Sequence, residues 1–464
     1  MCQLRLSRAG LAIAAIGWAL TLSAPSPAAG PGAPLHGTGA LDELGSVRDD
    51  LEAEGWLVHG QTTYVLQDHP RFRSPYTGPD SLTSDTRARQ TLSADAVFGR
   101  RLWNGAEFYV SPELDVGSGL NSSTGVAGAL NNEAFRLASD YPKITIPRLF
   151  IRQVIGFGGV QEHLDGDQLQ FDEMVDVERL TVTAGKISVW DIFDDNAYAH
   201  DARTQFLNWA LVGNGAVDFA ADARGFTPGV ALDYNRADWA VRTGVFQVSR
   251  DVNGKNLDDH ILDGYQVLLE IEERFQLFDR PGKLRELGMV DRTRAIDYQT
   301  SYGGLTGVNA ADPLPGFRRY RENGGLGLNL EQEVADELGL FSRLGWNPGR
   351  VQEFMYTEID WHASLGLSLK GGRWSRPDDT VGLAGLVNGL SDHHRRFLEA
   401  GNTGFIVGDG RLNYATEQVV ETYYDVALLK GANLAVNYAF VNNPGYNADR
   451  GPASVFSLRL HVEF

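Results

Sequence analysis

The chain has 464 residues, and 60 Asp and Glu against 41 Lys and Arg give it a formal net charge of −19 at pH 7. This acidic balance argues against a nucleic-acid-binding function, because phosphate contacts need clustered Lys and Arg. The 53 glycines and the aromatic content of 10% favour β structure, in a membrane barrel or in a large soluble β-sandwich.

The first 29 residues have the pattern of a secretory signal peptide. Arg5 and Arg8 precede an apolar run at residues 11–22, and small residues follow. We expect cleavage after Ala28 or Ala29, and no later segment has the apolar length of a transmembrane helix. The single cysteine, Cys2, lies in the basic part of this segment, so we expect neither a disulfide nor a lipid anchor.

Residues 30–55 are expected to form a Gly/Pro-rich spacer followed by a short amphipathic helix. Leu41, Leu44, Val47 and Leu51 recur at helical spacing, and Gly55 marks the end of the pattern.

From Trp56 to the end of the chain, the apolar residues recur with a period of two. In the last segment, Phe456 and Leu458 alternate with Ser457 and Arg459. Similar segments recur, and one of them spans Glu358 to Ser368. Counting them gives about sixteen antiparallel strands over residues 56–464. A single strand cannot separate a sandwich, whose polar face is outside, from a barrel, whose polar face lines the lumen.

The lengths of the connections favour the barrel. Short turns are expected at residues 100–105, 235–238, 335–337 and 430–432, and long loops at residues 67–87, 117–146, 188–224 and 391–412. Short turns at one end and long loops at the other are typical of outer-membrane barrels. Two connections, 157–177 and 276–291, are too long for the short-turn end, so we expect the strands there to extend further.

Five segments carry sequence that strand periodicity alone does not explain. They are LTVTAGKISVWDIFDDNAYAHDARTQFLNWAL (180–211), ADARGFTPGVALDY (221–234), SRPDDTVGLAGLVNGLSDHHR (375–395), GDGRLNYATEQVVETYY (408–424) and SVFSLRLHVEF (454–464). Together they resemble the OprB-type carbohydrate-selective porins of Gram-negative bacteria, over nearly all of the mature chain. The resemblance implies a 16-stranded outer-membrane barrel that passes sugars passively. The chain departs from the family pattern before Arg48, which leaves the docking of the N-terminal helix open.

Residues 188–224 would form the third outer loop, and this loop is rich in aromatic side chains. Because such side chains gain free energy on burial, we expect the loop to fold into the barrel and narrow the pore. The loop's candidate pore residues are Trp190, Asp191, Asp194, Asp195 and Arg203. The alternative is that these residues only anchor the loop.

Charged residues on the polar parity of the strands form the second candidate set. They are Arg148, Arg152, Arg179, Arg242, Arg343, Glu358, Asp360, Glu417 and Glu421, with Arg459, Glu107 and Glu113 on the same parity. Guanidinium groups opposite carboxylates offer the rigid donors and acceptors that sugar hydroxyls need. The alternative is that most of them neutralise one another across a hydrated wall.

These observations predict a passive, substrate-selective porin for carbohydrates or similar small polyhydroxylated solutes. A general diffusion porin is the first alternative. A barrel enzyme or a structural barrel is less favoured, because His59, His362 and His461 take lumen parity. We expect no cofactor and no metal site, and we expect His393 and His394 to lie in a solvated loop. The expected partners are sugars, outer-membrane lipid, the barrel-assembly machinery acting on Phe464, and a possible second copy of the chain.

Overall fold

The computed structural model describes residues 40–464 apart from 86, 135–139, 302–306 and 312–315. The predicted signal peptide and spacer lie outside the described residues. The described part of the chain opens with helix α2 (Ala40–Ala53), so the predicted short N-terminal helix is confirmed. Gly55 has a φ of 82°, a conformation that glycine adopts without strain, and it turns the chain from the helix into the first strand.

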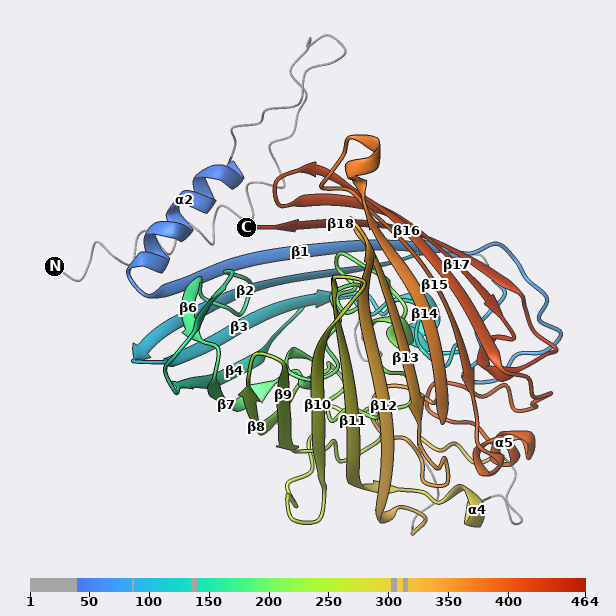
Figure 1. Cartoon of the computed structure of the whole chain (residues 1–464). Helices are drawn as coiled ribbons and strands as arrows, with labels where there is room; N and C mark the ends of the chain where they lie inside the picture. Colours follow the sequence, from blue (N-terminus) through green and yellow to red (C-terminus); the bar gives the residue numbers. More distant parts are fainter. Residues whose placement is uncertain (1–39, 86, 135–139, 302–306, 312–315) are drawn as a thin grey trace, which may run out of the picture.

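Sixteen antiparallel strands form one closed barrel, as the sequence predicts (Figure 1). They are β1 (Trp56–Asp68), β2 (Arg89–Trp103), β3 (Ala106–Val116), β4 (Lys143–Gly156), β7 (Arg179–Ile187), β8 (Thr227–Asn235), β9 (Trp239–Phe246), β10 (Tyr265–Leu277), β11 (Arg280–Ala295), β12 (Arg319–Ala335), β13 (Leu338–Trp346), β14 (Trp361–Lys370), β15 (Thr380–Gly389), β16 (Glu417–Leu429), β17 (Ala432–Asn442) and β18 (Ala453–Glu463). The first strand pairs with the last, Thr63 opposite His461, and this pairing closes the barrel.

The two faces of each strand have different chemistry. On β18, Phe456 is 52% exposed on the outer face while Arg459 is 1% exposed on the inner face. His59, His362 and His461 are all buried on the inner side, as predicted. The prediction is wrong for the segment before Trp361, because β14 begins only there and Ile359 is fully buried in a loop. The alternation of apolar and polar residues continues into that loop because the loop packs inside the barrel.

Short turns lie at one end of the barrel and long loops at the other. The turns between β2 and β3, β8 and β9, β12 and β13, and β16 and β17 fall where they were predicted. Strands β10 and β11 also extend as predicted, and their two-residue turn has a positive φ at both Phe278 and Asp279, which suits a tight hairpin.

The connection between β4 and β7 contradicts the prediction that these strands extend. It forms a separate hairpin of β5 (Gln161–Leu164) and β6 (Glu173–Asp176) at the short-turn end. Gly158 and Gly159 have φ values of 82° and 98°, and they turn the chain out of the barrel wall immediately after β4. The backbone N–H of Asp172 donates to the carboxylate of Glu52 at 2.7 Å, so this hairpin also contacts helix α2.

Short helices lie in the connections. They are η1 (Leu120–Ser123), η2 (Val189–Asp191), α3 (Trp209–Val212), α4 (Tyr298–Ser301), η3 (Gly371–Trp374), α5 (Asp392–Glu399) and η4 (Pro444–Tyr446). No helix in the described part of the chain is long and apolar enough to cross a membrane. The buried apolar residues of the long loops and of the inner wall form one large cluster and a small one at Val65, Ala202 and Leu207, so the hydrophobic core lies inside the barrel.

Candidate functional site

The connection between β7 and β8, residues 188–226 and named L3 below, folds into the barrel. Its aromatic side chains pack on the inner wall, where Phe193 meets Phe246 of β9 at a ring distance of 5.9 Å. Phe206 packs between Phe341 of β13 and Tyr423 of β16, at 5.4 and 5.0 Å. Phe193 and Phe206 are both fully buried. The inward course predicted for this loop follows from the burial of these rings.

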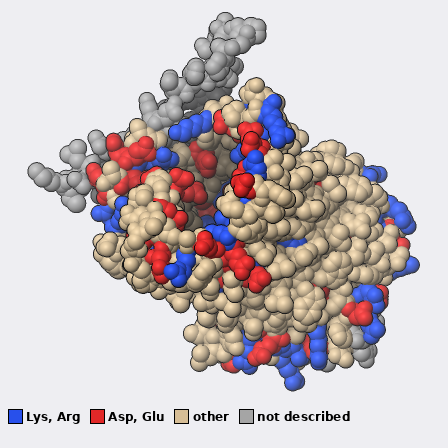
Figure 2. Space-filling model, in the orientation of Figure 1, with Lys and Arg blue, Asp and Glu red and all other residues tan. Residues whose placement is uncertain are grey.

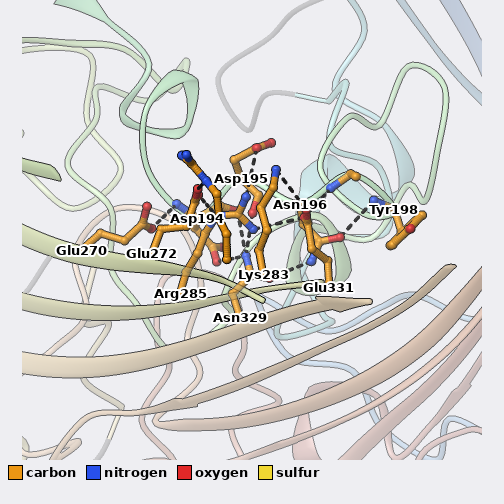
Figure 3. Close-up of polar contacts among 12 residues, drawn as sticks. Asp194, Asp195, Asn196, Tyr198, Glu270, Glu272, Lys283, Arg285, Asn329 and Glu331 are labelled. Atoms are coloured by element: carbon orange, nitrogen blue, oxygen red, sulfur yellow. Dashed lines mark hydrogen bonds and ion pairs between the residues drawn. The ribbon is translucent and has the colours of Figure 1, made fainter. Parts of the chain in front are cut away.

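Strands β10 to β13 hold the first half of L3 by charged and amide contacts (Figure 3). Asp194 lies at the centre, where its backbone N–H donates to the carboxylate of Glu270 at 2.7 Å. Its own carboxylate accepts hydrogen bonds from Asn329 at 2.7 Å and from Arg343 at 3.1 Å. The adjacent Asp195 pairs with Arg285 at 3.4 Å. The charges of Asp194, Arg343 and Arg285 are buried, and buried charges are stable only when they are paired in this way, so these residues fix the position of the loop.

Strands β16 and β18 hold the second half of L3. The carboxylate of Glu421 accepts the backbone N–H groups of Leu207 and Asn208 at 2.6 and 3.1 Å. Arg459 donates to the backbone carbonyls of Ala202 and Gln205 at 2.7 and 2.5 Å. L3 is therefore fastened along β10 to β18, and the lumen stays open beside β1 to β4.

A cavity of about 340 Å³, named the channel cavity, occupies this open part of the lumen. Strands β1 to β4 supply one side of it with Gln61, Asp95, Glu113 and Arg148, and L3 supplies the opposite side. It extends from Gln168 and Glu463 at the short-turn end to Asn253 and Met355 in the long loops. In Figure 2, acidic and basic side chains border a hollow in the surface.

The residues that open L3 shape one wall of the channel cavity. Ser188 and Asp191 form a capping box around η2, which fixes the side chain of Asp191. The same carboxylate accepts two hydrogen bonds from Arg148 of β4, at 2.7 and 2.8 Å. Trp190 lies between Ser188 and Asp191 in the sequence. Its ring stacks on that of Tyr356 with a ring distance of 4.6 Å and an interplanar angle of 22°. An aromatic face and a rigid donor–acceptor pair thus lie side by side.

Arg203 forms a second charged group on the L3 side of the cavity. Its guanidinium lies 3.5 Å from the carboxylates of Asp95 and Glu113, and 3.3 Å from that of Glu133. Strands β2 and β3 contribute the first two carboxylates, and the loop after β3 contributes the third. The guanidinium is therefore held between L3 and the opposite wall.

Five of the predicted candidates come together at the channel cavity: Glu113, Arg148, Trp190, Asp191 and Arg203. The remaining candidates do not line it. Arg152 donates to the carbonyl of Leu169 at 2.8 Å, and Arg179 pairs with Glu162 at 2.6 Å, so both hold the connection that contains β5 and β6. Arg242 pairs with Glu270 and Glu272, at 2.8 and 3.0 Å, within the wall. Asp194, Asp195, Arg343 and Glu421 anchor L3. A role in transport stays a prediction for every candidate.

The last three candidates, Glu417, Glu358 and Asp360, support other loops. Glu417 accepts the backbone N–H of Ala127 at 3.1 Å and that of Gly445 at 2.8 Å. Glu358, which belongs to a loop and not to β14, accepts three successive N–H groups from residues 405–407. Burial raises the pKa of Glu358 above its usual range.

Asp360 pairs with His394 at 3.2 Å. His394 is fully buried at the start of α5 and stacks on Tyr298 at 4.2 Å. The prediction of a solvated histidine is therefore wrong for His394, because the loops close over it. Among the described residues there is no group of three or more His, Cys, Asp or Glu that could hold a metal ion.

Several cavity residues were not among the candidates. Asp222, Arg224 and Phe226 end L3, and Tyr356 comes from the loop between β13 and β14. The guanidinium of Arg148 lies over the ring of Phe226 at 4.9 Å. Asp95 could have been predicted as a cavity residue, because it lies on the lumen-facing side of β2. No local pattern identifies Tyr356, because its place at the cavity depends on how two loops meet.

The comparisons with known proteins agree with this architecture. The profile of the carbohydrate-selective porin OprB family matches residues 80–464. No curated protein sequence matches the chain. The high-pH structure of Pseudomonas putida OprB is similar in fold, with a TM-score of 0.67 and 17% identity over 91% of this chain and 97% of that chain. The outer-membrane channel DcaP of Acinetobacter baumannii gives a TM-score of 0.50 and 11% identity, over 89% of this chain and 98% of that chain.

The family match covers most of the chain, and the two structural likenesses support the same barrel fold. Family and fold are those of channels, not of enzymes. The chain belongs to the carbohydrate-selective porin OprB family and is a substrate-selective outer-membrane porin.

Proposed function

We propose that sugars and similar small polyhydroxylated solutes diffuse passively through the channel cavity, and that L3 forms its constriction. The observation that carries this proposal is the placing of Trp190 beside the Arg148–Asp191 pair on the cavity wall. A sugar ring has an apolar C–H face and an equatorial set of hydroxyl groups. It therefore matches a wall with an aromatic face next to fixed donors and acceptors.

The pair between Arg148 and Asp191 is suited to select hydroxyl groups. A bidentate guanidinium–carboxylate pair has a fixed geometry, so the remaining donor and acceptor positions of each group point in defined directions. Both side chains keep partial exposure, 15% for Arg148 and 20% for Asp191. Solute hydroxyls can therefore exchange with water at this pair without burying an unpartnered group.

Arg203, farther along L3, supports the proposal. It joins L3 to β2 and β3 across the width of the cavity, so it limits the cross-section that a solute meets. Its side chain is 16% exposed, which leaves part of the guanidinium open to solutes. Asp191, Trp190, Arg148 and Arg203 are the residues that we assign to the constriction.

Single-channel recordings in planar bilayers test this assignment. Wild-type protein is expected to give small conductance steps that a preferred sugar blocks in a concentration-dependent way. Trp190→Ala and Asp191→Asn are expected to weaken the block by about tenfold, the effect of losing a contact of about 1.4 kcal/mol. Trp346→Ala is the matched control, because Trp346 is 55% exposed on the outer face of β13. Conductance that no sugar blocks would instead show a general diffusion porin.

Export, assembly and association belong to the same proposal. The charge and hydropathy pattern of residues 1–29 supports export through a cleaved signal peptide in a Gram-negative bacterium. The exposed apolar belt, with Leu326 at 62% and Val436 at 59%, supports insertion into outer-membrane lipid by the barrel-assembly machinery. A second copy of the chain would pack on this same belt. Chemical cross-linking of the protein in detergent would show whether it forms an oligomer.

A further inference from the structure

The channel cavity carries an excess of negative charge. Eight carboxylates line it, from Asp95, Glu113, Glu133, Asp167, Asp191, Asp201, Asp222 and Glu463. Three guanidinium groups and one imidazole oppose them, from Arg148, Arg203, Arg224 and His200. The excess is a property of the solute route and not only of the outer surface.

The pairing of these charges concentrates the excess at one place. Arg148 pairs with Asp191 through two hydrogen bonds at 2.7 and 2.8 Å. Arg203 instead faces the three carboxylates of Asp95, Glu113 and Glu133, at 3.3 to 3.5 Å. Among the described residues, one guanidinium therefore faces three carboxyl groups. This group of Arg203, Asp95, Glu113 and Glu133 is named the Arg203 cluster.

The Arg203 cluster is shielded from bulk water. The side chains of Asp95 and Glu113 are 2% and 4% exposed, and that of Glu133 is 10% exposed. Oδ1 of Asp95 is itself buried and lies 3.5 Å from the guanidinium of Arg203. Salt screens buried charges much less than exposed ones, so the field of the cluster acts across the narrow route.

We propose that the channel selects solutes by charge, favouring cationic amino sugars and small cations over neutral sugars and excluding anionic sugar acids and sugar phosphates. This inference rests on the proposed function, because it adds a charge preference to the same route. The field of the carboxylates of Asp95, Glu113 and Glu133 attracts the ammonium group of an amino sugar into the cavity. A solute carboxylate or phosphate meets like charge at the same place, and the single Arg203 is already shared.

Ion selectivity gives the most direct test. In a planar bilayer with a KCl gradient, the zero-current potential is expected to show that K⁺ passes about fivefold more readily than Cl⁻. A ratio of about fivefold already follows from one of the two excess carboxylates acting through about 7 Å of partly screened water on ions of opposite sign. Equal permeability, or a preference for Cl⁻, would overturn the proposal.

Variants assign the preference to the Arg203 cluster. The triple variant Asp95→Asn, Glu113→Gln and Glu133→Gln keeps side-chain shape and removes three charges, so the K⁺ to Cl⁻ ratio is expected to fall to about one or below. The single variant Glu133→Gln is the substitute if the triple variant does not insert into the bilayer, because Glu133 lies in a loop. It is expected to lower the K⁺ to Cl⁻ ratio part of the way. Asp165→Asn is the control, because the side chain of Asp165 is 98% exposed and outside the channel cavity. An unchanged ratio in the cluster variants would overturn the proposal.

Solute entry separates this inference from the proposed function. Proteoliposomes are loaded from outside with radiolabelled glucosamine, glucose or gluconate, which have similar sizes and different charges. The expected order of entry is glucosamine, then glucose, then gluconate. Equal entry of gluconate and glucose would overturn the charge preference and leave a sugar channel standing. If the K⁺ preference holds while no sugar blocks conductance, the proposed function fails and the charge preference stands.

Discussion

Substitution of Arg343 should change the channel strongly, although the side chain of Arg343 does not line the channel cavity. It is fully buried on β13, and its guanidinium donates to the carboxylate of Asp194 at 3.1 and 3.2 Å. It also donates to the backbone carbonyls of Ala199, Leu211 and Asp194, at 2.8, 2.7 and 3.0 Å. Arg343→Met removes all these contacts and leaves the carboxylate of Asp194 buried beside an apolar side chain.

Removing one partner of a buried ion pair costs about 3 to 5 kcal/mol. At about 1.4 kcal/mol for each factor of ten, the equilibrium between docked and released L3 shifts by roughly two to three and a half orders of magnitude. Glu421 and Arg459 still hold residues 202–208, and Glu270 still holds the backbone of Asp194, so we expect release only of the segments around Ala199 and Leu211. The channel should then show larger conductance steps and a weaker block by sugars.

Two further variants test the reasoning in the same bilayer assay. The double variant Arg343→Met with Asp194→Asn removes the stranded charge and should recover part of the wild-type conductance, because neighbouring charges are not additive. Arg280→Met is the control, because Arg280 pairs with Glu333 and with Asp336, whose side chain is 90% exposed. Wild-type conductance and sugar block in Arg343→Met would refute the view that this arginine holds L3 in place.

Two further predictions concern a channel ring and a loop. Gly213→Ala places a Cβ only 2.5 Å from Cζ2 of Trp190, so the indole must move and the sugar block should change; an unchanged block would argue against Trp190 as a channel residue. Asp360 and Glu358 raise the pKa of buried His394 above its usual value, although burial acts in the opposite direction. The protonated imidazole therefore stabilises the loop fully below about pH 6.5, and this contribution is lost as the pH rises through the higher folded pKa. The amide hydrogen exchange of residues 392–407, corrected for the intrinsic rate at each pH, should become faster over that pH range in the wild type. The increase should be smaller in His394→Gln. Protection that does not depend on pH would contradict the role of His394.

The strands could be predicted because their signal is local. A side chain on a strand faces either lipid or lumen, and each neighbour takes the opposite face, so a few residues such as Leu458 and Arg459 define both faces. The same signal fails at Ile359. This side chain packs inside the barrel, and the apolar interior of the loops selects the same residue types as lipid does.

The candidate site could be predicted only in part, because parity gives the direction of a side chain and not its partner. Arg148 and Arg343 both take lumen parity, yet the first lines the channel cavity and the second is buried under L3. Their partners, Asp191 and Asp194, lie only three residues apart in the chain. Which of the two pairs faces the channel depends on the path of L3 across the lumen, and that path is set by contacts distant in sequence.

The acidic composition of the chain has two separate causes. Glu270, Glu417 and Glu421 point inward from their strands and accept backbone N–H groups of the loops, so each of these carboxylates holds a loop inside the barrel. A folded loop has many N–H groups without backbone partners, and carboxylates are the strongest acceptors for them. These acids are occupied and give no charge preference to the channel. The Arg203 cluster differs, since its carboxylates face the cavity and share one guanidinium. Net charge alone could not distinguish the two sets, and only the second bears on which solutes pass.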